Sequence, residues 1–343
     1  MLFTLPSYNF ISAPLWIVTV LHIVTLTLHF LAMNFMVGGL AIVLFGCFKN
    51  KQENPVVEKF IRIFPSMMSA TVTLGVAPLL FVQLVYSKPI YAATVTSAWF
   101  WLMIFMVAMM SYYFLYGAAF STKFIGMKQR IYLTIALMGF VYVSFVYSAT
   151  FAMGEHPDVY QALYAGNQSG LVLNPDVFSY IFRWMHMLAG AVMVGGFFVV
   201  LLGRDNEQAF IVGRRFYLGA FLVSFALGIA YLFALKDILR LIMRSPAIWI
   251  LTGSIALSVL SVFWLYKRKI VLTSIALLVS FVGMVIVRHI VRLIYLKGSA
   301  LAFDPAQIPF QPQWSIFIIF LVFFVVAIAA VAYMFKLFYG EQV

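Results

Sequence analysis

Residues 184–203 read WMHMLAGAVMVGGFFVVLLG, twenty consecutive residues without a formally charged side chain. A helix of roughly 20 apolar residues crosses a hydrocarbon core about 30 Å thick, so this segment predicts a membrane span. The rest of the chain is similar, since 65% of its 343 residues are hydrophobic and 9% are charged. Typical globular proteins are about 25% charged. The composition excludes a soluble domain and predicts an all-α, polytopic membrane protein.

Nine charge-free runs reach or approach the length of a membrane span. They are 1–48, 63–87, 89–122, 131–154, 184–203, 216–235, 245–266, 270–287 and 305–335. A tenth run, 159–175, contains Gly, Asn, Gln and Pro, and we expect it to form a loop outside the membrane. The sequence therefore predicts nine transmembrane helices and no soluble domain.

The basic residues predict the orientation of these helices. Lys and Arg number fourteen in one set of alternate gaps and eight in the other. Because cytoplasmic loops carry the excess of Lys and Arg, the N-terminus is expected outside and the C-terminus inside. The net charge of +12 is then explained by topology and anionic membrane lipid, and no nucleic-acid partner is expected.

A repeat organises the predicted helices. Residues 29–39 read HFLAMNFMVGG and residues 186–196 read HMLAGAVMVGG, at an offset of 157 residues. The copies lie in the first and fifth predicted helices, an offset of four helices, so both copies cross the membrane in the same direction. We therefore expect two parallel four-helix units, residues 1–157 and 158–298. Residues 299–343 would form the ninth helix and the C-terminal tail.

The repeated histidines, His29 and His186, are candidate metal ligands. Ionisable groups inside a membrane are costly and are functional hypotheses by default. Neutral imidazole is the commonest protein ligand for metals, and histidines often hold haem iron in helical proteins. The glycines of the motif would let a neighbouring backbone or a flat macrocycle approach closely. Alternatively, the histidines hydrogen-bond across the bundle and the glycines serve packing.

Three further histidines complete the inventory. His22 lies two helical turns before His29 on nearly the same face, and His289 lies near the outer end of the eighth predicted helix. Both are expected inside the membrane and are candidate cofactor ligands, His289 also for metal. His156 is expected in a solvated loop. No carboxylate lies in the middle of a predicted span, which argues against a proton pump or an oxygen-reducing site.

Basic residues gather at the expected outer ends of two helices. Arg240 and Arg244 are four residues apart, as are Arg288 and Arg292, so each pair shares a helix face. Guanidinium groups suit carboxylates such as haem propionates and could also hold a quinone headgroup. Asp237 is the single carboxylate that the sequence places near them. The alternative is that these side chains reach out to lipid phosphates.

Two segments resemble subunit I of the cytochrome bd quinol oxidases. LHFL at 28–31 with Gly38-Gly39 is similar to its first helix, and RWMH at 183–186 with Gly195-Gly196 is similar to its fifth. That subunit also has nine helices in two four-helix bundles plus one, with its N-terminus outside. The resemblance implies that His29 and His186 are haem iron ligands near the outer side of a bacterial cytoplasmic (inner) membrane. Its specific motifs are confined to these two helices.

The chain also departs from that family. The GRQPW signature, the glutamate of helix 3 and the long quinol-binding loop between helices 6 and 7 are absent. Helix 7 lacks the methionine ligand, so His289, Met284 or Met243 would have to replace it. We therefore expect a shortened subunit with one or two haem b groups that does not reduce oxygen. It would exchange electrons between quinone and a periplasmic c-type cytochrome or another redox subunit, as part of a quinol-oxidising or quinone-reducing enzyme if catalytic.

Two other functions remain open on sequence grounds. A permease built from parallel repeats would line a central pathway with polar groups, and only scattered Ser, Thr, Asn34 and Gln83 are available. A cofactor-free membrane scaffold would use its histidines for packing. The presence or absence of haem in the purified protein separates these functions from a cytochrome.

Overall fold

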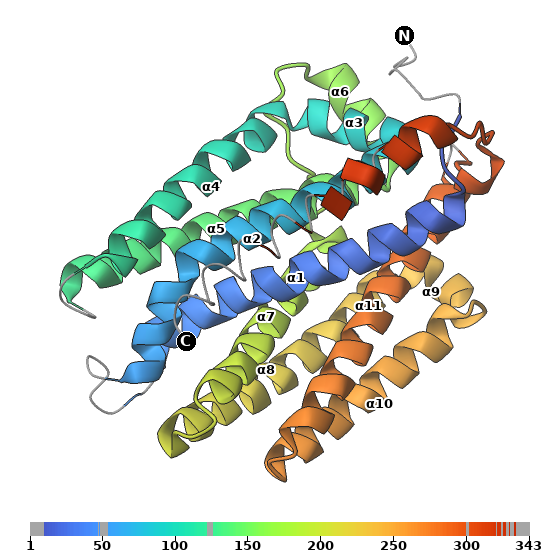
Figure 1. Cartoon of the computed structure of the whole chain (residues 1–343). Coiled ribbons are helices and arrows are strands. Elements are labelled where there is room, and N and C mark those ends of the chain that lie inside the picture. Colours follow the sequence, from blue (N-terminus) through green and yellow to red (C-terminus); the bar gives the residue numbers. More distant parts are fainter. Residues whose placement is uncertain are drawn as a thin grey trace.

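The protein is an all-helical bundle in which long helices lie side by side (Figure 1). The computed structural model describes residues 10–46, 48, 54–121, 126–299, 302–319 and scattered positions up to 333. The helices, in chain order, are α1 (Leu15–Phe45), α2 (Pro55–Val85), α3 (Ser87–Thr96), α4 (Ala98–Ala119), α5 (Met127–Gly154), α6 (Pro157–Gly166), α7 (Ile181–Leu202), α8 (Glu207–Ala234), α9 (Lys236–Met243), α10 (Ala247–Tyr266) and α11 (Ile270–Gly298). Two short 3₁₀ turns, Val177–Ser179 and Pro305–Gln307, interrupt the loops.

Eight of these helices are long and apolar enough to cross a membrane. They are α1, α2, α4, α5, α7, α8, α10 and α11, and they make the chain a polytopic membrane protein. The ninth span is not established, because only the shorter apolar segment Trp314–Phe323 falls in that region. Much of the predicted run 305–335 lies outside the residues that the structure describes.

Three predicted boundaries differ from the structure. The run 89–122 is divided at Ser97 into the short helix α3 and the spanning helix α4. The expected loop 159–175 forms no span, but α6 occupies its first part. Helix α8 begins at Glu207, before the charge-free run, because the Asn206 side chain accepts a hydrogen bond from the Ala209 amide and caps it. Charges thus mark the limits of the apolar run and not the limits of the helix.

The repeated glycines lie where helices approach most closely. Helix α1 packs against α2 and α7 packs against α8, while α1 and α7 contact each other. A Cβ built on Gly38 would lie 2.9 Å from Cα of Gly195, and one on Gly195 would lie 2.6 Å from Cα of Gly38. The second glycines face partners within each unit, Gly39 against Phe60 of α2 and Gly196 against the α8 backbone. For the glycines, the packing interpretation is therefore confirmed.

The remaining long helices show a further matched contact. Ser111 of α4 fills the space that a Cβ on Gly139 of α5 would need, and Ser254 of α10 does the same at Gly283 of α11. Both serine hydroxyls donate to the carbonyl four residues earlier, at 2.8 and 2.7 Å. Small residues thus set the approach of α4 to α5 and of α10 to α11 in the same way.

The segment before α1 pairs with the segment that leads to the last apolar run. The Ile11 amide donates to the Pro309 carbonyl at 2.8 Å, and the Gln311 amide donates to the Ile11 carbonyl at 3.0 Å. This isolated bridge between Ile11 and Phe310 is the single β-type pairing in the part of the chain described. It connects the segment before α1 to the segment after α11.

Candidate functional site

His29 of α1 lies against the backbone of α2. Its Nδ1 is 2.9 Å from the carbonyl oxygen of Thr71. A carbonyl oxygen only accepts hydrogen bonds, so Nδ1 carries the ring proton and donates it. One turn further along α2, a Cβ on Gly75 would lie 2.8 Å from Cε1 of the same imidazole. The ring therefore fits because position 75 has no side chain.

His186 of α7 makes the same arrangement with α8. Its Nδ1 is 2.8 Å from the carbonyl oxygen of Ser224. One turn further, a Cβ on Gly228 would lie 3.2 Å from Nδ1. Each of the two repeated histidines thus contacts the next spanning helix in the chain, α2 or α8, at a hydroxyl residue and at the glycine four positions after it.

Sequence reasoning missed these second-helix partners, although they carry a motif of their own. Residues 71–77 read TVTLGVA and residues 224–230 read SFALGIA. Their offset is 153 residues and not 157, because 42 residues separate His29 from Thr71 while 38 separate His186 from Ser224. A search at the fixed offset of the first motif passes over them.

The hydrogen bond at Nδ1 determines what the rest of each ring can do. Metal-binding histidines typically donate their other ring N–H to a carbonyl or carboxylate, which fixes the tautomer and the ring orientation. In both His29 and His186 the proton on Nδ1 leaves Nε2 as an unprotonated nitrogen with a lone pair. Both rings are half-buried. The residues therefore suit imidazole ligation of a metal or a haem iron.

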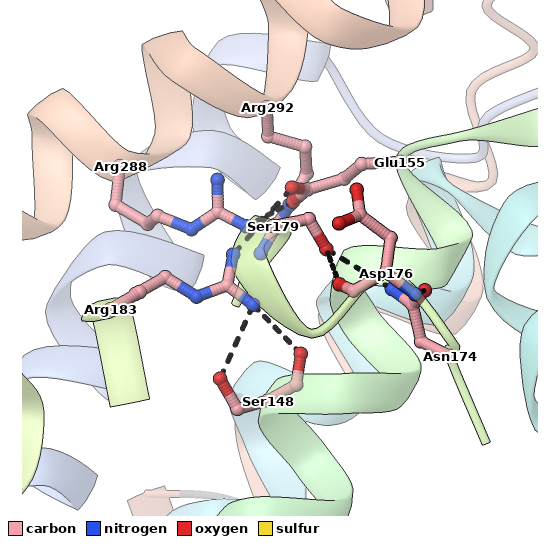
Figure 2. Close-up of polar contacts among 8 residues, drawn as sticks. All are labelled: Ser148, Glu155, Asn174, Asp176, Ser179, Arg183, Arg288 and Arg292. Atoms are coloured by element: carbon pink, nitrogen blue, oxygen red, sulfur yellow. Dashed lines mark hydrogen bonds and ion pairs between the residues drawn. The ribbon is translucent and has the colours of Figure 1, made fainter. Parts of the chain in front are cut away.

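A buried ionic cluster lies at the α3 and α6 end of the bundle (Figure 2). Glu155, the residue that ends α5, is 4% exposed. Its carboxylate accepts from Arg288 and from Nε of Arg292 at 3.3 Å, and lies 3.6 Å from Nη1 of Arg183. Arg183 also donates to the Ser148 carbonyl at 2.8 Å. We call Glu155, Arg183, Arg288 and Arg292 the arginine cluster.

The arginine cluster corrects the expected partner of these arginines. The sequence indicated Asp237 as the nearby carboxylate, whereas the structure pairs Arg288 and Arg292 with Glu155. The two arginines are 133 and 137 residues from Glu155 in the chain, so only the folded helices bring them together. Glu155 lies at the end of α5, in agreement with the expectation that no carboxylate lies in the middle of a span.

The cluster holds more positive than negative charge. Burial raises the pKa of Glu155, but Arg288, Arg183 and Arg292 outweigh it and lower the pKa from 4.5 to about 2. One carboxylate then faces three guanidinium groups. Nη1 of Arg288 and Nη1 of Arg292 are buried and have no hydrogen-bond partner among the described residues. Buried polar groups are nearly always hydrogen-bonded, and these two N–H groups are available to donate to a further acceptor.

The two remaining candidate histidines meet beside the arginine cluster. The ring centroids of His22 and His289 are 6.3 Å apart. The ring centroid of Tyr86 lies 6.4 Å from that of His289, and the guanidinium of Arg292 lies over the Tyr86 ring. A narrow cleft beside Tyr86 and Arg292 is lined otherwise by mainly apolar residues of α3, α5 and α11. The structure thus gathers His22, His289, Arg288 and Arg292 at one place.

Other predicted residues lie elsewhere. Arg240 and Arg244 are exposed and belong to the short amphipathic helix α9 and its C-terminal cap, not to the end of a spanning helix. They are not part of the arginine cluster. His156 lies in the connection between α5 and α6, as expected, but it is half-buried because its ring packs edge-on against Tyr295, with 4.6 Å between the ring centroids.

Within the described ranges, no group of three or more His, Cys, Asp or Glu side chains could hold a metal ion. A haem iron needs at most two protein ligands, so this finding bears on bare metal ions and not on haem. No protein-family model matches the sequence, and no curated protein matches it significantly.

Proposed function

We propose that the protein is a haem b-containing electron-transfer subunit of a bacterial cytoplasmic membrane. It would exchange electrons between the quinone pool and a periplasmic c-type cytochrome or another redox subunit. One or two haem b groups, held by His29 and His186, would supply the one-electron chemistry. Oxygen reduction is not part of the proposal, because the carboxylates of the described helices lie at their ends.

The duplicated imidazole arrangement supports this proposal most. Two histidines at equivalent positions each use Nδ1 on a backbone carbonyl and rest on a glycine one turn further. The hydrogen bond fixes the tautomer of both rings and leaves both Nε2 atoms as lone-pair donors. A ligand histidine needs this arrangement, because its lone pair must be aimed at the metal.

The arginine cluster supports a role near the anionic parts of the cofactor or near quinone. Arg288 and Arg292 would donate their free Nη1 groups to haem propionates or to quinone carbonyl oxygens. Arg240 and Arg244, exposed on α9, would hold lipid phosphate, a quinone headgroup or the acidic surface of a redox partner.

Absorption spectroscopy of the purified protein tests the function. We expect a red protein whose dithionite-reduced spectrum shows a b-type α band. His29→Ala and His186→Ala should each lower the haem-to-protein ratio. His156→Ala is the matched control, since that ring lies outside the spans, and it should keep full haem content. A colourless wild-type protein would overturn the proposal and favour a scaffold or a permease.

A further inference from the structure

A second pair of imidazoles lies close together between α1 and α11. His22 comes from α1 and His289 from α11, and their ring planes are inclined by 49°. About two helical turns away, Phe30 of α1 and Phe281 of α11 also contact each other, with 6.3 Å between their ring centroids. His22 is 5% exposed, so the pair is enclosed and not displayed to lipid.

Both rings retain an unused nitrogen. Nδ1 of His22 is 3.2 Å from the Pro78 carbonyl oxygen, which leaves its Nε2 as a lone-pair donor. Nδ1 of His289 is buried and makes no hydrogen bond within the described chain. Leaving a buried polar atom without a partner is unfavourable, and the neighbouring Arg288 and Arg292 each have one more such atom.

The spacing of the rings fits a shared metal. A metal–imidazole bond is about 2.0–2.1 Å long, and a ring radius of roughly 1.2 Å on each side would then place two ligating rings roughly 6.4 Å apart. The observed 6.3 Å agrees with this value. A bare metal ion would want a third or fourth protein ligand, and the described residues supply none beside the pair. Haem iron needs only these two.

The surrounding charge fits haem as well. Arg288 and Arg292 lie one residue before and three residues after His289 on α11, each with a buried Nη1 free. Three guanidinium groups against one carboxylate leave an excess of two positive charges. The two propionates of a haem carry about two negative charges, and charge-assisted bonds from guanidinium to carboxylate are among the strongest in proteins.

We infer that His22 and His289 are the two axial ligands of one haem, with Arg288 and Arg292 binding its propionates. This inference rests on the proposed function and adds a centre that is separate from His29 and His186. The centre joins α1 of the first unit to α11 of the second. Electrons could then pass between the units at their contact and not only within each unit.

Haem content in single and double variants tests the inference. His22→Ala and His289→Ala should each lower the haem-to-protein ratio by the same amount, and the double variant should lose no more than either single one. Combination with His29→Ala should lose further haem. If His22→Ala and His289→Ala keep full haem content while His29→Ala does not, the inference is wrong and the proposed function stands. If wild-type protein contains no haem, the proposed function fails first.

Metal analysis and the addition of imidazole to glutamine variants test the inference further. Metal analysis of the same samples distinguishes haem iron from a bare ion, since loss of copper, zinc or non-haem iron in His22→Ala would overturn the haem assignment. If alanine variants do not fold, His22→Gln and His289→Gln, purified with and without added imidazole, serve instead. Recovery of the low-spin spectrum by imidazole supports ligation, and unchanged spectra in both Gln variants contradict it.

Discussion

Glu155 is the residue on which the buried charges depend. Removing one partner of a buried ion pair is strongly destabilising because the other charge stays buried and uncompensated. Glu155→Gln keeps the shape of the side chain but leaves three guanidinium groups without a carboxylate. We expect it to lower the free energy of unfolding by about 3–5 kcal/mol, measured by thermal denaturation in detergent.

The control for that experiment is an exposed pair. Glu207 pairs with Arg268 at the surface, where solvent screens the pair, so Glu207→Gln should change stability much less than Glu155→Gln does. The contribution of Glu155 to the stability of the protein also depends on pH. Since the pKa of Glu155 is lowered from 4.5 to about 2, its contribution is present above pH 4.5 and is lost as the pH falls toward 2. Equal stability of both variants would contradict the electrostatic role of the cluster.

Gly75 is the residue that allows His29 to lie on α2. A methyl group there would meet the imidazole at 2.8 Å and displace the ring from the Thr71 carbonyl. We expect Gly75→Ala to shift or weaken the reduced α band without loss of folded protein. Gly219→Ala is the matched control on the opposite unit, because a Cβ there meets nothing within 4 Å. Identical spectra for both variants would show that the ring position does not matter.

At the scale of elements, the crossing of α1 and α7 depends on two glycines. A Cβ at Gly38 or Gly195 would enter the backbone of the other helix, and backbone cannot move aside as a side chain can. Overpacking typically costs 1–3 kcal/mol, so Gly38→Ala and Gly195→Ala should each lower the melting temperature. Gly253→Ala, on the exposed face of α10, should not. A stable Gly38→Ala variant would mean that the helices do not cross there.

The elements also show how far sequence reasoning reaches. Long apolar runs predicted eight of the spanning helices, because the membrane imposes length and composition on each helix separately. The break at Ser97 was not predicted, since no Pro or Gly marks it. Glu155 and its three arginines were not paired, because their contact depends on how α5, α7 and α11 pack. The partners Thr71 and Ser224 were detectable, but only at a different offset.

At the scale of the whole molecule, the orientation in the membrane is a prediction that labelling can check. In a Cys47→Ser background, Ser169→Cys lies in the loop before α7 and Asp205→Cys lies between α7 and α8, both exposed. If the N-terminus is outside, an impermeant thiol reagent should label position 169 in intact cells. Position 205 should react only after the membrane is permeabilised. The reverse pattern would show that the excess of cytoplasmic Lys and Arg has been misassigned.

The reciprocal contact of Gly38 with Gly195 has a consequence for the origin of the fold. A surface on which equivalent residues touch each other is what a two-fold axis produces between identical subunits. A half-length ancestor that dimerised through this glycine would have carried every ligand in duplicate. In a single fused chain, the two halves would no longer need to carry the same ligands. His22 now stands where the second copy has Ser179, at the offset of 157 residues, and Glu155 can bind arginines that only one half provides.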